Sequence, residues 1–186
     1  MSTLFVDSIQ PKTTGSQLII APAIQTGATL QTQFTQYTGT TSVSLSGNTS
    51  TEINVLTLNI TPKSTSSIIR LDSHVFHEWS DQNKATENVW FFYRDSVLLR
   101  APVVGSRPSG IAMSTLSHHS SDAGSTPEMV YYSYFDTPNT TNQITYKVGV
   151  VVNANSTVFI NRTVTDNDNN AHERGISFIS ATEIGG

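Results

Sequence analysis

The sequence contains no cysteine and little charge. The lack of cysteine excludes disulfide bonds, thiolate catalysis and cysteine-based zinc sites. Charged residues make up 13% of the 186 residues, about half the share in an average domain. The net charge is −4, and no basic cluster occurs. Because nucleic-acid binding depends on Lys and Arg side chains that neutralise phosphates, we expect no nucleic-acid partner.

Long apolar runs and targeting signals are also missing. No segment approaches the roughly 18 consecutive apolar residues of a membrane-spanning helix. The opening residues 1–7 lack the basic and apolar regions of a signal peptide. We therefore expect neither membrane insertion nor a signal peptide. The hydrophobic share of 37%, which includes many β-branched and aromatic residues, excludes a disordered chain and is enough for a packed core.

Residues 1–38 differ in composition from the rest of the chain. Pro11, Gly15, Pro22 and Gly27 divide this stretch into short extended pieces. About 40 residues of this kind do not fold alone, yet they carry apolar side chains that should be buried. We therefore predict that residues 1–38 form an extended anchor and trimerisation segment that docks onto other chains. The predicted anchoring residues are Leu4, Phe5, Val6, Ile9, Leu18, Ile19 and Ile20.

From residue 39 to residue 186, strand signals recur about every ten residues. The clearest run, 144–152, places apolar side chains at every second position. No window shows the apolar periodicity of a helix. Many short strands with polar turns predict an all-β fold, a jelly-roll-like β-sandwich knob over residues 39–186. The other predicted strands are 53–60, 69–75, 88–94, 97–100, 110–116, 128–135, 157–161 and 176–183.

Two predicted strands carry aromatic residues on both faces, in the segments 90–93 and 129–135. A strand in a two-layer sandwich normally has one face in water, so the second face should also be covered. Interfaces of homo-oligomers are rich in aromatic residues. We therefore predict a homotrimer, with an interface that includes Trp90, Phe92, Tyr132 and Tyr134.

Signatures of catalysis and of metal binding are absent. The chain has no nucleophile elbow, phosphate-binding loop or dinucleotide fingerprint. His74 and His77 are three residues apart on a predicted strand, so they should point to opposite faces, near solvent, and not share a zinc ion. The segment 166–170 lacks the Gly and Glu of an EF-hand, so an Asx-rich turn is favoured over a looser calcium site. We expect no enzyme activity, no cofactor and no metal.

One loop has the composition of a sugar site. Trp79, Asp81 and Asn83 combine an indole with a carboxylate and an amide, which suits ring stacking and hydrogen bonds to hydroxyls. Packing of Trp79 on the sandwich edge is an equally good interpretation. A host-glycan-binding adhesin is therefore one alternative function. A small polysaccharide hydrolase, using carboxylates such as Asp81 and Glu87, is a second.

Blocks that span nearly the whole chain resemble a known family. They are Phe5–Ile20, Ile60–Ile68, Tyr93–Ser96, Phe135–Thr141, Thr145–Val148, Val158–Arg162 and Gly175–Ile184. In this order they resemble small virion structural proteins of tailed phages, common in cyanophages and often labelled tail-fibre-like. The resemblance implies a trimeric, β-rich particle protein without enzyme activity.

The length of the chain narrows the role that this resemblance implies. A long fibre needs repeats or a coiled coil, and the sequence has neither. An N-terminal anchor with one compact knob better suits a capsid decoration (cement) protein, a head fibre or a short tail-fibre component. The expected partners are other copies, capsid or tail proteins and, as an alternative, a host surface glycan. The expected location is the virion, which is assembled in the host cytoplasm and extracellular when mature.

Overall fold

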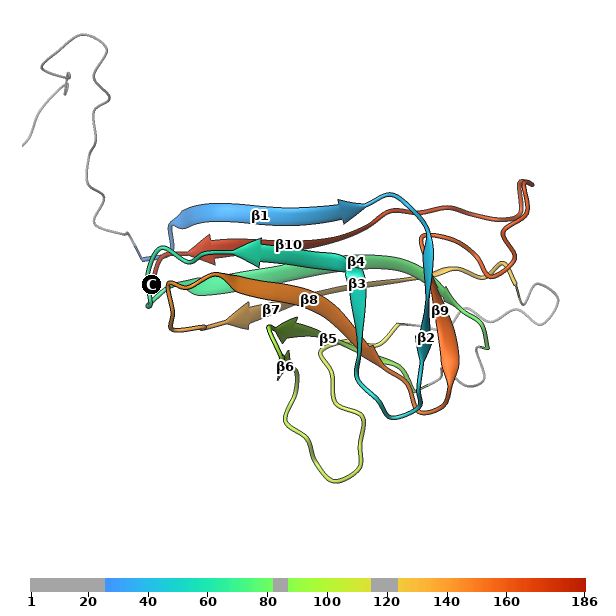
Figure 1. Cartoon of the computed structure of the whole chain (residues 1–186), viewed down its shortest axis with the longest axis horizontal. Helices are drawn as coiled ribbons and strands as arrows, with labels where there is room; N and C mark the ends of the chain where they lie inside the picture. The colour runs from blue at the N-terminus through green and yellow to red at the C-terminus, as the bar shows by residue number, and fades with distance from the viewer. Residues whose placement is uncertain (1–25, 82–86, 115–123) are drawn as a thin grey trace, which may run out of the picture.

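The computed structural model describes residues 26–81, 87–114 and 124–186, which form ten strands (Figure 1). In this part of the chain no helix is long and apolar enough to cross a membrane. The strands are β1 (Thr29–Tyr37), β2 (Thr41–Leu45), β3 (Thr51–Ile60), β4 (Ile68–Trp79), β5 (Val89–Arg94), β6 (Val97–Leu99), β7 (Glu128–Asp136), β8 (Ile144–Val151), β9 (Ser156–Ile160) and β10 (Ser177–Ile184).

The strands pair like one long antiparallel hairpin that has been rolled up. β5 pairs with β6, β4 with β7, β3 with β8, β2 with β9 and β1 with β10. Along the chain, each of these pairs therefore encloses the pair named before it. Rolling brings β10 against β4 and β8 against β5. One sheet therefore contains β1, β10, β4 and β7 side by side. In the same sheet β9 pairs with the C-terminal end of β4, from His77 to Trp79, and β2 pairs with β9. The other sheet has the order β3-β8-β5-β6. This nested topology is a jelly-roll-like β-sandwich, which confirms the predicted fold class.

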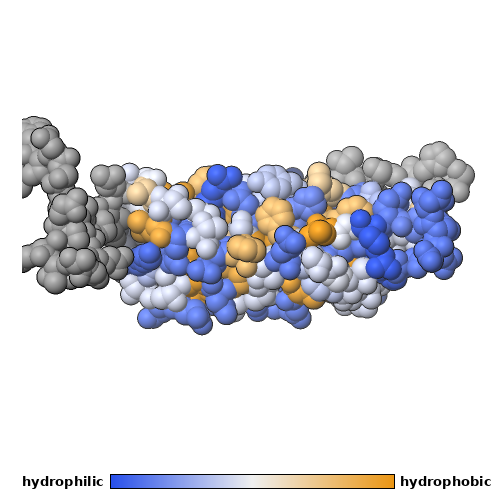
Figure 2. Space-filling model, turned by 90° about the horizontal axis from the view of Figure 1, so that it is seen from above, coloured by the Kyte–Doolittle hydropathy of each residue, from blue (hydrophilic) through white to orange (hydrophobic). Residues whose placement is uncertain are grey.

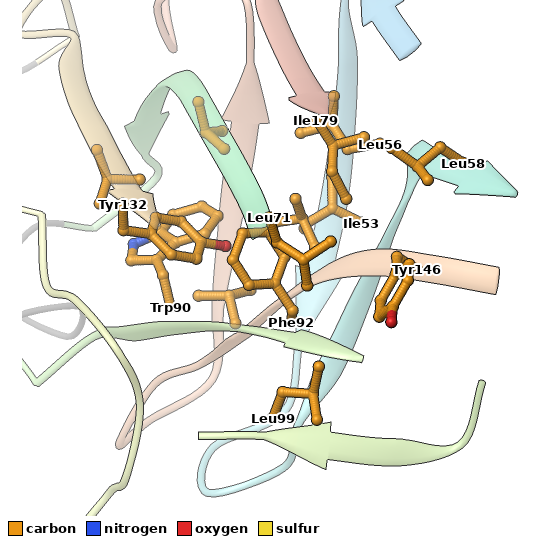
Figure 3. Packing of buried hydrophobic residues seen from close by; sticks show 14 of the residues in the cluster. Ile53, Leu56, Leu58, Leu71, Trp90, Phe92, Leu99, Tyr132, Tyr146 and Ile179 are labelled. Atoms are coloured by element: carbon orange, nitrogen blue, oxygen red, sulfur yellow. The ribbon is translucent and has the colours of Figure 1, made fainter. Parts of the chain in front are cut away.

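The inner faces of the two sheets form the main core (Figure 3). The alternation predicted for 144–152 is confirmed, because Ile144, Tyr146, Val148 and Val150 all point inward and are buried. Side chains from the opposite sheet, such as Leu71, meet them there.

Trp90, Phe92 and Tyr132 lie in this core and not at a subunit interface. Their exposed fractions are 0%, 0% and 5%, and the Phe92 and Tyr132 ring centroids are 4.7 Å apart. Tyr134 is half-buried and packs against the same cluster. The prediction that Trp90, Phe92 and Tyr132 form a trimer interface is wrong, because the same chain already covers them. For Tyr134 it stays a prediction.

The aromatic side chains on the other face of β5 are covered by a loop. Phe91 and Tyr93 form a second buried cluster, against which Ile111 packs. Backbone hydrogen bonds hold the loop there: Trp90 N donates to Ala112 O at 2.8 Å, and Ile111 N donates to Trp90 O at 2.7 Å. Residues 110–114 make this single bridge and do not form the predicted strand. Both faces of β5 are thus covered within one chain.

The body of the protein begins earlier than predicted. β1 pairs with β10 from Thr29 to Tyr37. Gly27 N donates to Gly185 O at 2.7 Å, and Gly185 N donates to Ala28 O at 2.8 Å. The predicted domain boundary between residues 38 and 39 is therefore wrong, because β1 is an integral strand of the sandwich. The seven predicted anchoring residues, from Leu4 to Ile20, lie outside the described residues.

Candidate interaction face

The outward sides of β4 and β7 form one continuous surface. Their side chains alternate between the core and the outside, and the strands are held in register by the antiparallel ladder. We call the eight outward residues of this ladder the β4–β7 face. Its cross-strand pairs are Phe76 with Met129, His74 with Tyr131, Asp72 with Ser133 and Arg70 with Phe135.

Large apolar side chains are exposed along β7. Met129, Tyr131 and Phe135 are 56%, 54% and 60% exposed, whereas their neighbours Val130 and Tyr132 point into the core. β7 is also an edge strand, because β4 is its only strand neighbour in the part of the chain that the structure describes. Exposed edge strands are prone to pair with other chains, and Met, Tyr and Phe are enriched in protein interfaces. The β7 side chains therefore have the composition of a protein contact.

A single carboxylate organises the middle of the face. Oδ1 of Asp72 accepts hydrogen bonds from Ser133 Oγ at 2.6 Å, from Arg70 Nη2 at 3.0 Å and from Tyr131 OH at 3.2 Å. The hydrogen bond and charge of Asp72 raise the pKa of Arg70, so the guanidinium stays charged. These bonds hold the Tyr131 ring and the Arg70 side chain in place before any partner binds. Such preorganisation lowers the entropy lost on binding.

The β4–β7 face carries no net charge. Its two charged side chains, Arg70 and Asp72, form an ion pair at 3.0 Å. Partial burial lowers the pKa of His74 below 6.5, so its imidazole is neutral at pH 7. Neither Lys nor Glu is among the eight residues. The face is therefore a neutral surface on a molecule whose net charge is −4.

Three other exposed apolar residues lie on the opposite side of the sandwich. Val103, Val104 and Met113, in the loop that covers β5, are 58%, 60% and 58% exposed.

Figure 2 looks down on the β1 side, where hydrophobic residues occur as separate spots among polar ones. The many Thr and Gln residues of β1 are consistent with this polar edge.

Trp79, the aromatic residue of the predicted sugar site, is not accessible to a sugar. Trp79 is fully buried, with its ring centroid 5.9 Å from that of Trp90 and 5.3 Å from that of His77. The prediction that Trp79 stacks on a glycan is wrong, because no sugar can reach a ring with no exposed surface. Asp81 is half-buried just beyond the end of β4, and Asn83 lies outside the described residues.

The two histidines of β4 point to opposite faces, as predicted, but His77 is not near solvent. It is fully buried, its Nδ1 lies 3.1 Å from Val75 O, and its Nε2 lies 3.7 Å from Glu128 Oε2. Burial lowers the pKa of His77 to about 4. Its position beside two tryptophan rings makes His77 part of the core and not a metal ligand.

Two other acidic residues have structural partners. Glu78 is fully buried, and its carboxylate accepts hydrogen bonds from Thr126 N at 2.8 Å and from Val164 N at 2.6 Å. It therefore ties two loops to β4. In the Asx-rich segment 166–170, Asp166 accepts hydrogen bonds from Arg162 at 3.1 Å and from Arg174 at 2.7 Å. Its carboxylate is thus engaged by arginines of the same chain.

Comparison with known proteins gives structural likenesses but no relative by sequence. No protein-family model matches the chain, and no curated protein does. Among solved structures, the crystal structure of the infectious bursal disease virus VP2 subviral particle is similar in fold over 84% of this chain, at 12% sequence identity and a TM-score of 0.36. The similar part is 42% of the VP2 chain, so this chain spans less than half of that protein's length.

Proposed function

We propose that this protein is a non-enzymatic structural component of a tailed-phage virion. In this proposal it is a homotrimeric surface protein with a jelly-roll body and an N-terminal anchor. It serves as a capsid decoration or cement protein, a head fibre or a short tail-fibre component. The observation that carries the proposal is the neutral β4–β7 face with its exposed Met129, Tyr131 and Phe135, because exposed apolar side chains of this kind suit a protein that works in an assembly.

Two further features support the proposal. The sequence blocks described above resemble virion structural proteins over nearly the whole chain. The described chain also begins beside its C-terminus, at one end of the sandwich, where Gly27 is bonded to Gly185 (Figure 1). An anchor attached at this end would leave the β4–β7 face and the loops at the other end available. Binding across neighbouring virion subunits would then add avidity.

Analysis of purified virus particles tests the proposed location. Mass spectrometry of particles from the virus that encodes this chain should detect the protein, and an antibody against the body should label the particle surface. A variant lacking residues 2–25 should keep the β-rich circular dichroism spectrum, because all described strands lie beyond residue 26. It should be lost from particles, whereas the control Thr13→Asp should be incorporated. Full incorporation of the truncated protein would contradict the anchor.

A second candidate function is glycan binding on the β4–β7 face. The exposed Tyr131 ring lies beside Asp72 and Arg70, which are suitable partners for sugar hydroxyls. A glycan array that compares the wild type with Tyr131→Ala tests this alternative. Binding that depends on Tyr131 would support an adhesin, and binding by neither protein would remove it.

A further inference from the structure

We infer that the β4–β7 face is the surface through which copies of this chain contact one another. This inference rests on the proposed homotrimer and names its interface. It replaces Trp90, Phe92 and Tyr132, which are buried in the core, with outward residues of β4 and β7. Met129, Tyr131 and Phe135 are each more than half exposed in the single chain, so another chain can cover them.

Charge does not oppose a second copy as the occupant of the face. With a net charge of −4, two copies repel each other on average. The β4–β7 face adds no like-charge contact to this repulsion, because Arg70 and Asp72 neutralise each other on it. Like charges placed opposite each other would oppose assembly, and this face supplies none at pH 7.

The apolar positions on the two edges of the sheet fit a ring of copies. Phe34, on the opposite edge strand β1, is 70% exposed and points to the same outer side. It pairs with Ser180 of β10, which in turn pairs with Asp72 of the β4–β7 face. If the β7 edge of one copy meets the β1 edge of the next, Phe135 and Phe34 are covered together. A contact between two different edges of this kind is heterologous and closes into a ring when the rotation allows it.

The position of the chain ends fits the same arrangement. Gly27 and Gly185 lie together at one end of the sheet that carries the face. Copies packed through this sheet, with their strands along a common axis, would send every N-terminal segment out at the same end. The anchors of all copies would then reach one attachment point, as the proposed function requires.

Sedimentation equilibrium of the full chain at micromolar concentrations tests the interface. The variants are Met129→Asp and Phe135→Asp, and the controls are Val104→Asp and Met113→Asp, which are equally exposed on the opposite side. We expect a trimer for the wild type and for both controls. We expect at least a hundredfold weaker association for each face variant, since a charge then lies in the contact of every subunit. Circular dichroism and urea unfolding should show that all four variants are folded.

The outcomes separate the inference from the proposed function. A wild-type trimer that neither face variant weakens would overturn the interface and leave the proposed virion role intact. A monomeric wild type would overturn the homotrimer and the interface, while the particle experiment would still decide the location. Glycan binding by a monomer, abolished in Tyr131→Ala, would assign the face to sugar and overturn the inference.

The absence of cysteine permits a second, independent test. A chain with Phe34→Cys and Phe135→Cys has no other thiols. Mild oxidation should link copies into dimers and trimers on a non-reducing gel, because the two positions meet between subunits. A chain with Phe34→Cys and Val104→Cys is the control and should not form the ladder. A trimeric double variant without specific links would overturn the contact between the β7 and β1 edges.

Discussion

Two adjacent tyrosines of β7 should respond very differently to truncation. Tyr132 is 5% exposed, lies 4.7 Å from Phe92 between ring centroids and donates a hydrogen bond to Phe91 O at 3.0 Å. Tyr132→Ala removes a buried ring and should lower the free energy of unfolding by about 3–5 kcal/mol. Tyr131 is 54% exposed, and its hydroxyl bonds Asp72 on the surface. Tyr131→Ala should cost about 0.5–1 kcal/mol within one chain.

Urea unfolding followed by tryptophan fluorescence measures this difference, because both tryptophans lie in the core. It should be carried out at a concentration where sedimentation shows single chains. Tyr132→Phe separates the hydroxyl from the ring and should cost about 1–2 kcal/mol, since the buried hydrogen bond to the Phe91 carbonyl is lost. Equal losses for Tyr131→Ala and Tyr132→Ala would refute the reasoning. So would a loss below about 1 kcal/mol for Tyr132→Ala, because that value is typical of a surface site.

Two further predictions concern the core. Burial lowers the pKa of His77 to about 4, against 6.5 in the unfolded chain, so the unfolded chain takes up the proton first as the pH falls. The free energy of unfolding should therefore fall by about 3 kcal/mol between about pH 6.5 and pH 4. Urea titrations of His77→Gln over the same pH range should not show this loss. Parallel pH curves for the two proteins would mean that Glu128 stabilises a charged imidazole. At Gly149, a β-carbon would lie 2.5 Å from the Phe91 ring and 2.6 Å from the Tyr93 ring. Gly149→Ala should cost about 1–3 kcal/mol through overpacking, and an unchanged melting temperature would show that the rings move aside.

The sequence predicts the fold well where a strand buries one whole face. The 144–152 run alternates because β8 is a central strand whose inner side chains are all buried. β1 is not predicted, since an edge strand of mostly Thr and Gln buries few apolar residues and shows little periodicity. Its pairing with β10, nearly 150 residues away in the chain, is a long-range contact that local pattern does not reveal.

The interface residues show where local pattern fails. Alternation separates Met129, Tyr131 and Phe135 from Val130 and Tyr132, but both sets are apolar. The two-residue alternation along the strand therefore does not by itself show which set of side chains faces the core. The structure decides through contacts across the sandwich, such as that between Tyr132 and Phe92. For β5, the outer face is covered by the loop that contains Ile111. This loop folds back onto the strand through tertiary contacts, which the local sequence pattern does not reveal.

The rolled topology leaves open the edge that the proposed assembly uses. β4 has β10 on one side and β7 on the other, but the strands before and after β7 cross to the second sheet, so β7 gains only one neighbour in the described chain. The other edge strand of the same sheet, β1, is rich in Thr and Gln and exposes one large apolar side chain, Phe34. β7 instead exposes three large apolar side chains around a neutral ion pair. Because both edges belong to one sheet and share one topology, fold alone does not explain this difference. A neighbouring copy that brings the β1 edge, with Phe34, against the three apolar side chains of β7 would explain it, and these exposed side chains are the strongest reason to expect one.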